Sequence, residues 1–96
     1  MNYIQIVEYE SDRHADIMAA AAGQVQDAID RGWPRIAVTK DRDHPNRYLY
    51  VVEFPSYEDA MDSSRSASTQ AFAKIMSELS TSGPTFRNLD VEQIVS

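Results

Sequence analysis

The chain has 96 residues, of which 43% are hydrophobic and 25% are charged, a composition typical of a globular domain rather than of a disordered one. This length allows a single domain, residues 1–96, with a modest hydrophobic core. The net charge of −6 argues against nucleic acid or an anionic membrane as the main partner, since both require a basic surface. The absence of cysteine excludes disulfides, thiolate metal sites and cysteine nucleophiles. Because there is no apolar run of about 18 residues and no signal-peptide pattern, we expect a cytoplasmic protein without a membrane span.

The first half of the chain begins with a predicted strand and a long predicted helix. Residues 3–9 are rich in β-branched and aromatic side chains, which favour a strand. From residue 13 to residue 31 the apolar side chains recur at steps of three and four, the spacing of one helix face. Ser11 or Asp12 is the expected N-terminal cap, and Gly32 is expected to end the helix.

A β-hairpin is predicted in the middle of the chain. Residues 35–40 form a short strand candidate, and residues 47–54 carry the strongest strand signal of the sequence. The polar segment 41–46 between them contains Pro and Asn and is typical of a turn. Two strands joined by so short a turn are expected to pair antiparallel.

The last third of the chain predicts a helical region and a final strand. Ser56 and Asp59 form a variant of the capping box, which indicates a helix start. Helical periodicity then extends over 57–79, with an expected break at 66–68 because the serines there can cap a second helix. Alternating apolar residues over 86–95 predict the final strand.

This order of elements predicts an α+β fold, the ferredoxin-like βαββαβ sandwich, with a four-stranded antiparallel sheet and its helices on one face. In that arrangement the first and third strands are central, and these are also the most apolar strands of the sequence. The third strand is apolar on both faces, with Tyr48, Tyr50, Val52 and Phe54 alternating with Leu49 and Val51. Because the helices can cover only one face, the other needs a partner, and a second copy is the simplest one. We therefore expect a homodimer.

The element order and the doubly apolar strands resemble the dimeric α+β barrel superfamily, whose best-known members are the antibiotic-biosynthesis monooxygenases. The most suggestive stretches are residues 54–61, 69–73 and 85–91, which look like those of small actinobacterial proteins of unassigned function. The resemblance implies a dimeric α+β barrel with a pocket between each sheet and its helices. Such proteins include cofactor-free oxygenases, haem-degrading oxygenases, isomerases and proteins without known chemistry, so the resemblance predicts fold better than function.

The ionisable residues offer no clear metal or catalytic site. His14 lies at a helix start and His44 in a turn, and both are expected to be surface residues, although a base at His14 or a pocket-mouth role for His44 is conceivable. They lack metal-ligand spacing, so we expect no metal site and no bound metal, haem or flavin. Glu8 and Glu53 are expected at opposite edges of the sheet rather than as a carboxylate pair, and Glu8 is expected to meet Arg47 across the strands.

Aromatic residues are the remaining candidates for a site. We predict ligand binding by Tyr9, Trp33, Tyr50 and Phe72, with a tyrosine hydroxyl orienting a flat molecule, while core or dimer-interface packing is the alternative for each. No catalytic residue can be named. The resemblance implies a small-molecule enzyme, a cofactor-independent monooxygenase-like protein acting on an aromatic or polyketide-like compound. The alternative is a non-catalytic small-molecule-binding or interaction module with the same fold, so whether the protein is an enzyme stays open.

Overall fold

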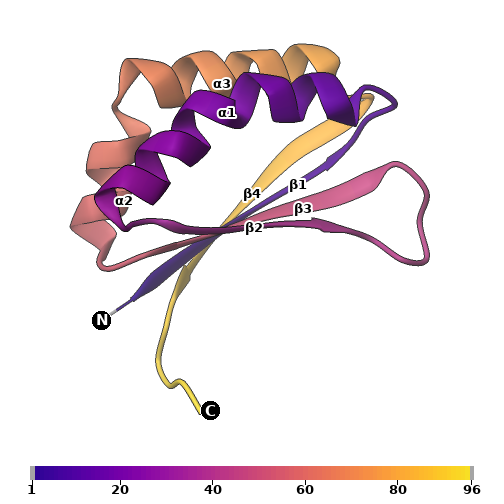
Figure 1. Ribbon diagram of the computed structural model, residues 1–96. Coiled ribbons are helices and arrows are strands. Elements are labelled where there is room, and N and C mark those ends of the chain that lie inside the picture. The colour runs from indigo at the N-terminus through magenta and orange to yellow at the C-terminus, as the bar shows by residue number, and fades with distance from the viewer. Residues whose placement is uncertain (1, 96) are drawn as a thin grey trace.

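The computed structural model describes residues 2–95 as a layer of helices on one face of an antiparallel sheet, with the other face uncovered (Figure 1). The elements in chain order are β1 (Tyr3–Glu10), α1 (His14–Arg31), β2 (Arg35–Lys40), β3 (Arg47–Phe54), α2 (Tyr57–Ser64), α3 (Ala67–Leu79) and β4 (Ser82–Asp90). The predicted α+β, ferredoxin-like βαββαβ order is confirmed, with its second helix in two parts. Among the described residues, no helix combines the length and the apolar character that a membrane crossing requires.

The sheet has the strand order β2-β3-β1-β4 with every pair antiparallel, so β1 and β3 are central as predicted. In the register of the central pair, Val7 lies opposite Tyr50 and Ile6 lies opposite Val51. Successive side chains of a strand point to opposite faces, so the pair Val7 and Tyr50 lies on one face of the sheet and the pair Ile6 and Val51 on the other. The sequence pattern of the third strand therefore predicted correctly that both faces of the sheet are apolar.

The helix-facing side of the sheet carries the hydrophobic core. Its buried members come from β1, β3 and all three helices and are Tyr3, Val7, Tyr9, Ile17, Ala21, Tyr50, Val52, Phe54, Ala60, Phe72 and Met76. On the opposite side, Ile4, Ile6, Leu49 and Val51 are only partly exposed because their neighbours on the sheet shield them. No element within residues 2–95 packs over that open face (Figure 1).

The start of α1 differs from the prediction. Its N-cap is Arg13, which makes no capping hydrogen bond through its side chain. Ser11 is instead fully buried, where its Oγ accepts a hydrogen bond from the Arg13 backbone N–H at 2.9 Å and donates one to the Leu79 carbonyl at 2.7 Å. The hydroxyl thus connects the start of α1 to the end of α3. Gly32 ends the helix as predicted, in the left-handed conformation that a glycine adopts without strain.

The two later helices begin where serine side chains cap them. Ser56 Oγ accepts a hydrogen bond from the Asp59 N–H at 3.1 Å, which confirms the predicted helix start. Ser66 Oγ accepts one from the Thr69 N–H at 3.2 Å, so α3 begins at the predicted break. These caps satisfy N–H groups that have no partner within a helix, which is why serines separate α2 from α3.

The prediction for the last strand was wrong at both ends. The strand is β4, Ser82–Asp90, not residues 86–95, so Ser82, Gly83 and Pro84 belong to it. Gly83 has φ +83°, and a Cβ atom there would lie 2.8 Å from the Glu8 carbonyl oxygen. The pairing of β4 with β1 shifts register between Glu8 and Glu10 at this point. A glycine at this position permits the bulge, so the strand can begin before the residue at which its apolar alternation starts.

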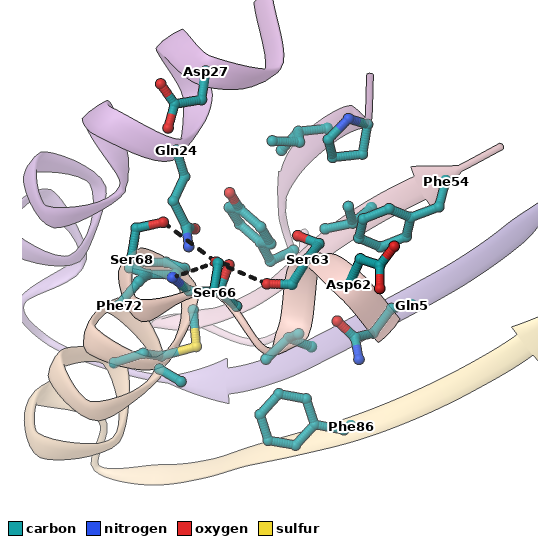
Figure 2. Close-up of a pocket in the computed structure, with 18 of the residues that line it drawn as sticks. Gln5, Gln24, Asp27, Phe54, Asp62, Ser63, Ser66, Ser68, Phe72 and Phe86 are labelled. Carbon is teal, nitrogen blue, oxygen red and sulfur yellow. Dashed lines mark hydrogen bonds between the residues drawn. The ribbon is translucent and has the colours of Figure 1, made fainter. Parts of the chain in front are cut away.

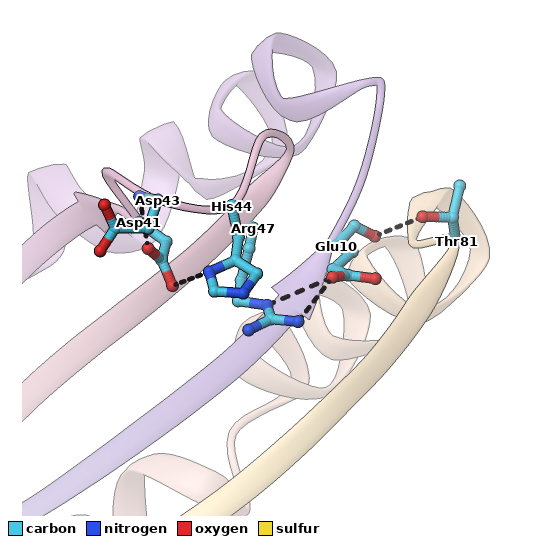
Figure 3. Close-up of polar contacts among 6 residues, drawn as sticks. All are labelled: Glu10, Asp41, Asp43, His44, Arg47 and Thr81. Carbon is cyan, nitrogen blue, oxygen red and sulfur yellow. Dashed lines mark hydrogen bonds and ion pairs between the residues drawn. The ribbon is translucent and has the colours of Figure 1, made fainter.

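The cross-strand ion pair forms two residues away from its predicted position. Arg47 lies opposite Glu10 rather than Glu8, and its guanidinium donates two hydrogen bonds to Glu10 Oε1 at 3.1 and 3.2 Å (Figure 3). The Thr81 backbone N–H donates to the Glu10 carbonyl at 2.7 Å, so the same residue also holds the start of β4. The strand register, which the sequence alone does not specify, decides which glutamate meets Arg47.

Candidate functional site

A cavity of about 360 Å³ lies between the sheet and the helices. It is bounded by the second half of α1, the junction of α2 with α3, and the helix-facing side of the sheet (Figure 2). Its sheet side is mainly apolar and consists of Gln5, Val7, Ile36, Tyr50, Val52, Phe54 and Phe86. Apolar side chains of α3, Phe72 and Met76 among them, continue this lining. The volume and the mainly apolar lining of the cavity are typical of small-molecule sites.

Apart from Gln5 of β1 and the Tyr50 hydroxyl, the polar lining residues belong to α1 and to the α2–α3 junction. Gln24 and Asp27 come from one face of α1, and Asp62, Ser63, Ser66 and Ser68 lie at the α2–α3 junction (Figure 2). Arg31 of α1 and Thr69 of α3 also line the cavity. Asp27, Arg31, Asp62 and Ser68 are exposed, whereas the apolar sheet residues Val7, Tyr50, Val52 and Phe54 are buried. The cavity therefore has an apolar interior and a polar mouth.

The Tyr50 hydroxyl is a buried polar group among the apolar side chains on the sheet side of the cavity. Tyr50 is only 4% exposed, and its hydroxyl oxygen is buried without a hydrogen-bond partner among residues 2–95. Its ring packs on Phe72 with centroids 5.6 Å apart. Burial raises the pKa of Tyr50, so the hydroxyl keeps its proton at neutral pH. An unpaired buried hydroxyl costs free energy, and a ligand oxygen that accepted its proton in a hydrogen bond would remove that cost.

Arg31 is held at the cavity mouth by two contacts with Trp33. Its guanidinium carbon lies 4.1 Å from the centroid of the Trp33 ring, and its Nε–H donates to the Trp33 carbonyl at 2.9 Å. Asp27 precedes it by one helical turn on the same face, yet no ion pair joins Arg31 to a carboxylate within residues 2–95. The stacking on Trp33 orients the guanidinium and leaves its terminal nitrogens without an anionic partner in this part of the chain.

The structure brings together only two of the four predicted ligand-binding residues. Tyr50 and Phe72 line the cavity, whereas Tyr9 and Trp33 do not. Tyr9 is 1% exposed, and its hydroxyl is hydrogen-bonded to His14 Nδ1 at 2.9 Å. Trp33 packs against the core and contacts Arg31, which lines the mouth. Binding by these residues stays a prediction, and their positions favour Tyr50 and Phe72.

The histidines lie away from the cavity. The expectation that His14 is exposed was wrong, because its ring stacks on Tyr48 and it is only partly accessible. Burial, and secondly the nearby charge of Lys40, lower the pKa of His14. His44 is exposed in the β2–β3 turn, as expected, with Nδ1 3.4 Å from Asp41 Oδ2 (Figure 3). Within residues 2–95 no three His, Asp or Glu side chains converge as a metal site would require.

Sequence reasoning missed the polar residues of the mouth. The sequence pattern indicates only that Arg31 ends a helix and gives Gln24 no apparent role. Gln24, Asp27 and Arg31 recur at steps of three and four, which indicates one helix face, but only the packing of α1 over the sheet shows that this face borders a cavity.

No family model matches the sequence, and no curated protein matches it. Solved structures do share its fold. A variant of SnoaB, a cofactor-independent oxygenase from Streptomyces nogalater, superposes with a TM-score of 0.80 at 12% identity, over 98% of this chain and 96% of that one. A candidate antibiotic biosynthesis monooxygenase from Nitrosomonas europaea gives 0.79 at 14% identity, over 95% and 90%. Rv0793 from Mycobacterium tuberculosis gives 0.82 at 12% identity, over the whole of both chains. The chain therefore shares the ferredoxin-like α+β fold of these proteins, among them a candidate antibiotic biosynthesis monooxygenase and a cofactor-independent oxygenase.

Proposed function

We propose that the protein binds a flat aromatic or polyketide-like molecule in the cavity between sheet and helices and oxidises it as a cofactor-independent monooxygenase. The observation that carries the proposal is the Tyr50 hydroxyl, buried at the side of an apolar cavity with no partner among the described residues. An apolar cavity beside an unpartnered buried donor is suited to a ring system that carries an acceptor oxygen. SnoaB, a cofactor-independent oxygenase that shares this fold, supports the chemical part of the proposal.

The reaction needs little from the protein beyond binding and orientation. A phenol or enol that has lost its proton is electron-rich and reduces dioxygen directly. For a reactive methylene, one oxygen atom becomes the new carbonyl and the other leaves as water, so that R₂CH₂ and O₂ give R₂C=O and H₂O. In this scheme Tyr50 donates a hydrogen bond to the substrate oxygen on which negative charge develops, and the apolar lining excludes water.

Oxygen uptake tests the enzyme, and fluorescence tests binding. Trp33 is the only tryptophan of the chain and stacks on Arg31 at the cavity mouth, so a bound ligand should change its emission. We expect saturable fluorescence changes with polycyclic phenols, and equal amounts of oxygen consumed and product formed with at least one of them. Saturable binding without any oxygen uptake across a broad panel would contradict the oxygenase.

A non-catalytic binding protein is the alternative, and one observation favours it. Neither histidine lines the cavity, and the carboxylates that do, Asp27 and Asp62, lie at its exposed mouth. A substrate would therefore have to lose its proton largely through its own acidity. Binding that is retained with weakly acidic ligands, together with no turnover of strongly acidic ones, would identify the protein as a binder.

We also propose that a second copy covers the open face of the sheet. That face has an apolar centre formed by Ile4, Ile6, Leu49, Val51 and Leu89. Glu8, Glu53, Arg35 and Arg87 occupy the surrounding positions on the same face. Two acids and two bases around an apolar centre suit an interface in which the same surface meets itself across a two-fold axis. The segment after β4 also runs away from the helices, with Ile94 and Val95 exposed (Figure 1).

Light scattering coupled to size-exclusion chromatography tests the assembly. We expect the mass of two chains at micromolar concentration. The two copies would bury the apolar centres of their open faces against each other, and this burial should hold the dimer together at that concentration. A monomer at that concentration would contradict the proposal without affecting the one on ligand binding.

A further inference from the structure

We infer that the ligand of this cavity carries an anionic group, a carboxylate or an equivalent acid, which Arg31 binds at the mouth while the apolar part of the ligand lies inside. The inference rests on the proposed ligand-binding function and adds the charge of the ligand and the residue that recognises it. The observation behind it is a guanidinium that borders an apolar cavity and is oriented by Trp33 without a carboxylate partner within residues 2–95.

The orientation of Arg31 matters as much as its charge. An arginine side chain that moves freely on the surface loses entropy when it binds an anion, and such contacts contribute little. Here the stack on Trp33 and the Nε–H hydrogen bond to the Trp33 carbonyl already restrict the side chain. The terminal nitrogens remain to donate, and a guanidinium can bind both oxygens of a carboxylate with two parallel hydrogen bonds.

The other charges at the mouth give the anion one favoured position. Asp62 is 3.3 Å from Arg65 and so is partly compensated. Asp27 lies one turn from Arg31 without a cationic partner in the described part of the chain, so it repels an anion. A ligand carboxylate is therefore favoured at the Arg31 guanidinium and disfavoured close to Asp27. In a chain with net charge −6, this local cation is an exception to the overall charge.

Tyr50 and Arg31 recognise different parts of the ligand, and this difference can be measured. Fluorene, fluorenone and their carboxylates are flat three-ring molecules that differ only in a ketone oxygen and an acidic group. We expect each carboxylate isomer that fits to bind about three- to tenfold more tightly than its uncharged parent. The ketone should bind about tenfold more tightly than fluorene, because it satisfies the Tyr50 hydroxyl.

Variants assign each preference to its residue. Arg31→Gln should remove the preference for the carboxylate and retain the preference for the ketone. Tyr50→Phe should remove the preference for the ketone and retain the preference for the carboxylate. Arg31→Lys should keep part of the carboxylate preference, since the charge remains but the planar fork is lost. Asp27→Asn should increase the carboxylate preference. Arg13→Gln is the matched control: Arg13 precedes the same helix, is paired with Asp16 at 3.0 Å and does not line the cavity.

The dissociation constants can be measured by Trp33 fluorescence and by calorimetry at two salt concentrations, with the carboxylate preference decreasing as salt increases. Equal affinity for the acids and their uncharged parents, or a carboxylate preference that Arg31→Gln leaves intact, would overturn the inference while the cavity remained a binding site. If none of the compounds bound, fluorene included, the proposed function itself would fail. Circular dichroism of each variant separates loss of binding from loss of folding.

Discussion

The imidazole of His14 lies flat against the phenol ring of Tyr48, with centroids 3.7 Å apart and planes inclined by 4°. The Tyr9 hydroxyl lies 2.9 Å from His14 Nδ1, so a neutral imidazole can accept its proton there in a hydrogen bond. Three residues from β1, α1 and β3 thus form one aromatic cluster. It joins the start of the long helix to both central strands.

This cluster predicts a pH dependence of stability. Burial and, secondly, Lys40 lower the pKa of His14, so the folded protein favours the neutral ring. The free energy of unfolding should therefore fall as the pH decreases below about 6.5, the ordinary histidine pKa, because the unfolded chain then binds the proton more readily. Urea denaturation at about pH 7.5 and about pH 5 measures this change. His14→Gln should reduce the pH dependence, and the exposed His44→Gln serves as control. An unchanged dependence in His14→Gln would contradict the prediction.

Tyr50→Phe and Tyr9→Phe make the same change in two buried tyrosines with opposite expected results. The Tyr50 hydroxyl has no partner among residues 2–95, so its removal should leave the unfolding free energy of the unliganded protein unchanged or slightly higher. Removing the Tyr9 hydroxyl breaks its contact with His14 and should cost about 1 kcal/mol. Thermal or urea denaturation compares the two. A marked loss of stability in Tyr50→Phe would show that the hydroxyl has a structural partner.

Gly83→Ala and Gly23→Ala should change stability in opposite directions. Gly83 has φ +83°, and an added Cβ would lie 2.8 Å from the Glu8 carbonyl oxygen, so the alanine should cost more than about 1 kcal/mol. Gly23 lies within α1, and an added Cβ would meet no side chain or other element within 4 Å, so alanine there should stabilise the protein by about 0.5–1 kcal/mol. Urea denaturation midpoints measure both. Equal effects would contradict the bulge between β1 and β4.

Val51→Asp tests the proposed dimer at the centre of the open face. Val51 lies opposite Ile6 on β1 and Ala37 on β2, so a carboxylate there would be buried in the interface and should shift the protein toward monomer. Light scattering measures the shift, and circular dichroism checks that the chain stays folded. Ser77→Asp on the exposed side of α3 introduces the same charge and should leave the mass unchanged. A folded Val51→Asp variant that kept the dimer mass would contradict this interface.

Local signals in the sequence identified most of the elements correctly. Gly32 and Ser56 ended and began helices as predicted because the capping geometry depends on residues within one turn. The bounds of β2 and β3 were correct because alternation and a short polar turn are also local. The order of the elements then left few possible topologies, and the ferredoxin-like one was correct.

The sequence by itself therefore determined the elements, their order and the presence of two apolar sheet faces, since each follows from neighbours along the chain. Only the tertiary structure decided which side chains from distant elements meet. Strand register paired Arg47 with Glu10 instead of Glu8, and a left-handed glycine carried β4 through Gly83. Helix packing placed His14 on Tyr48, and it left the Tyr50 hydroxyl and Arg31 around one cavity. Register and packing depend on how the whole core fills its volume, which no short segment of the sequence encodes.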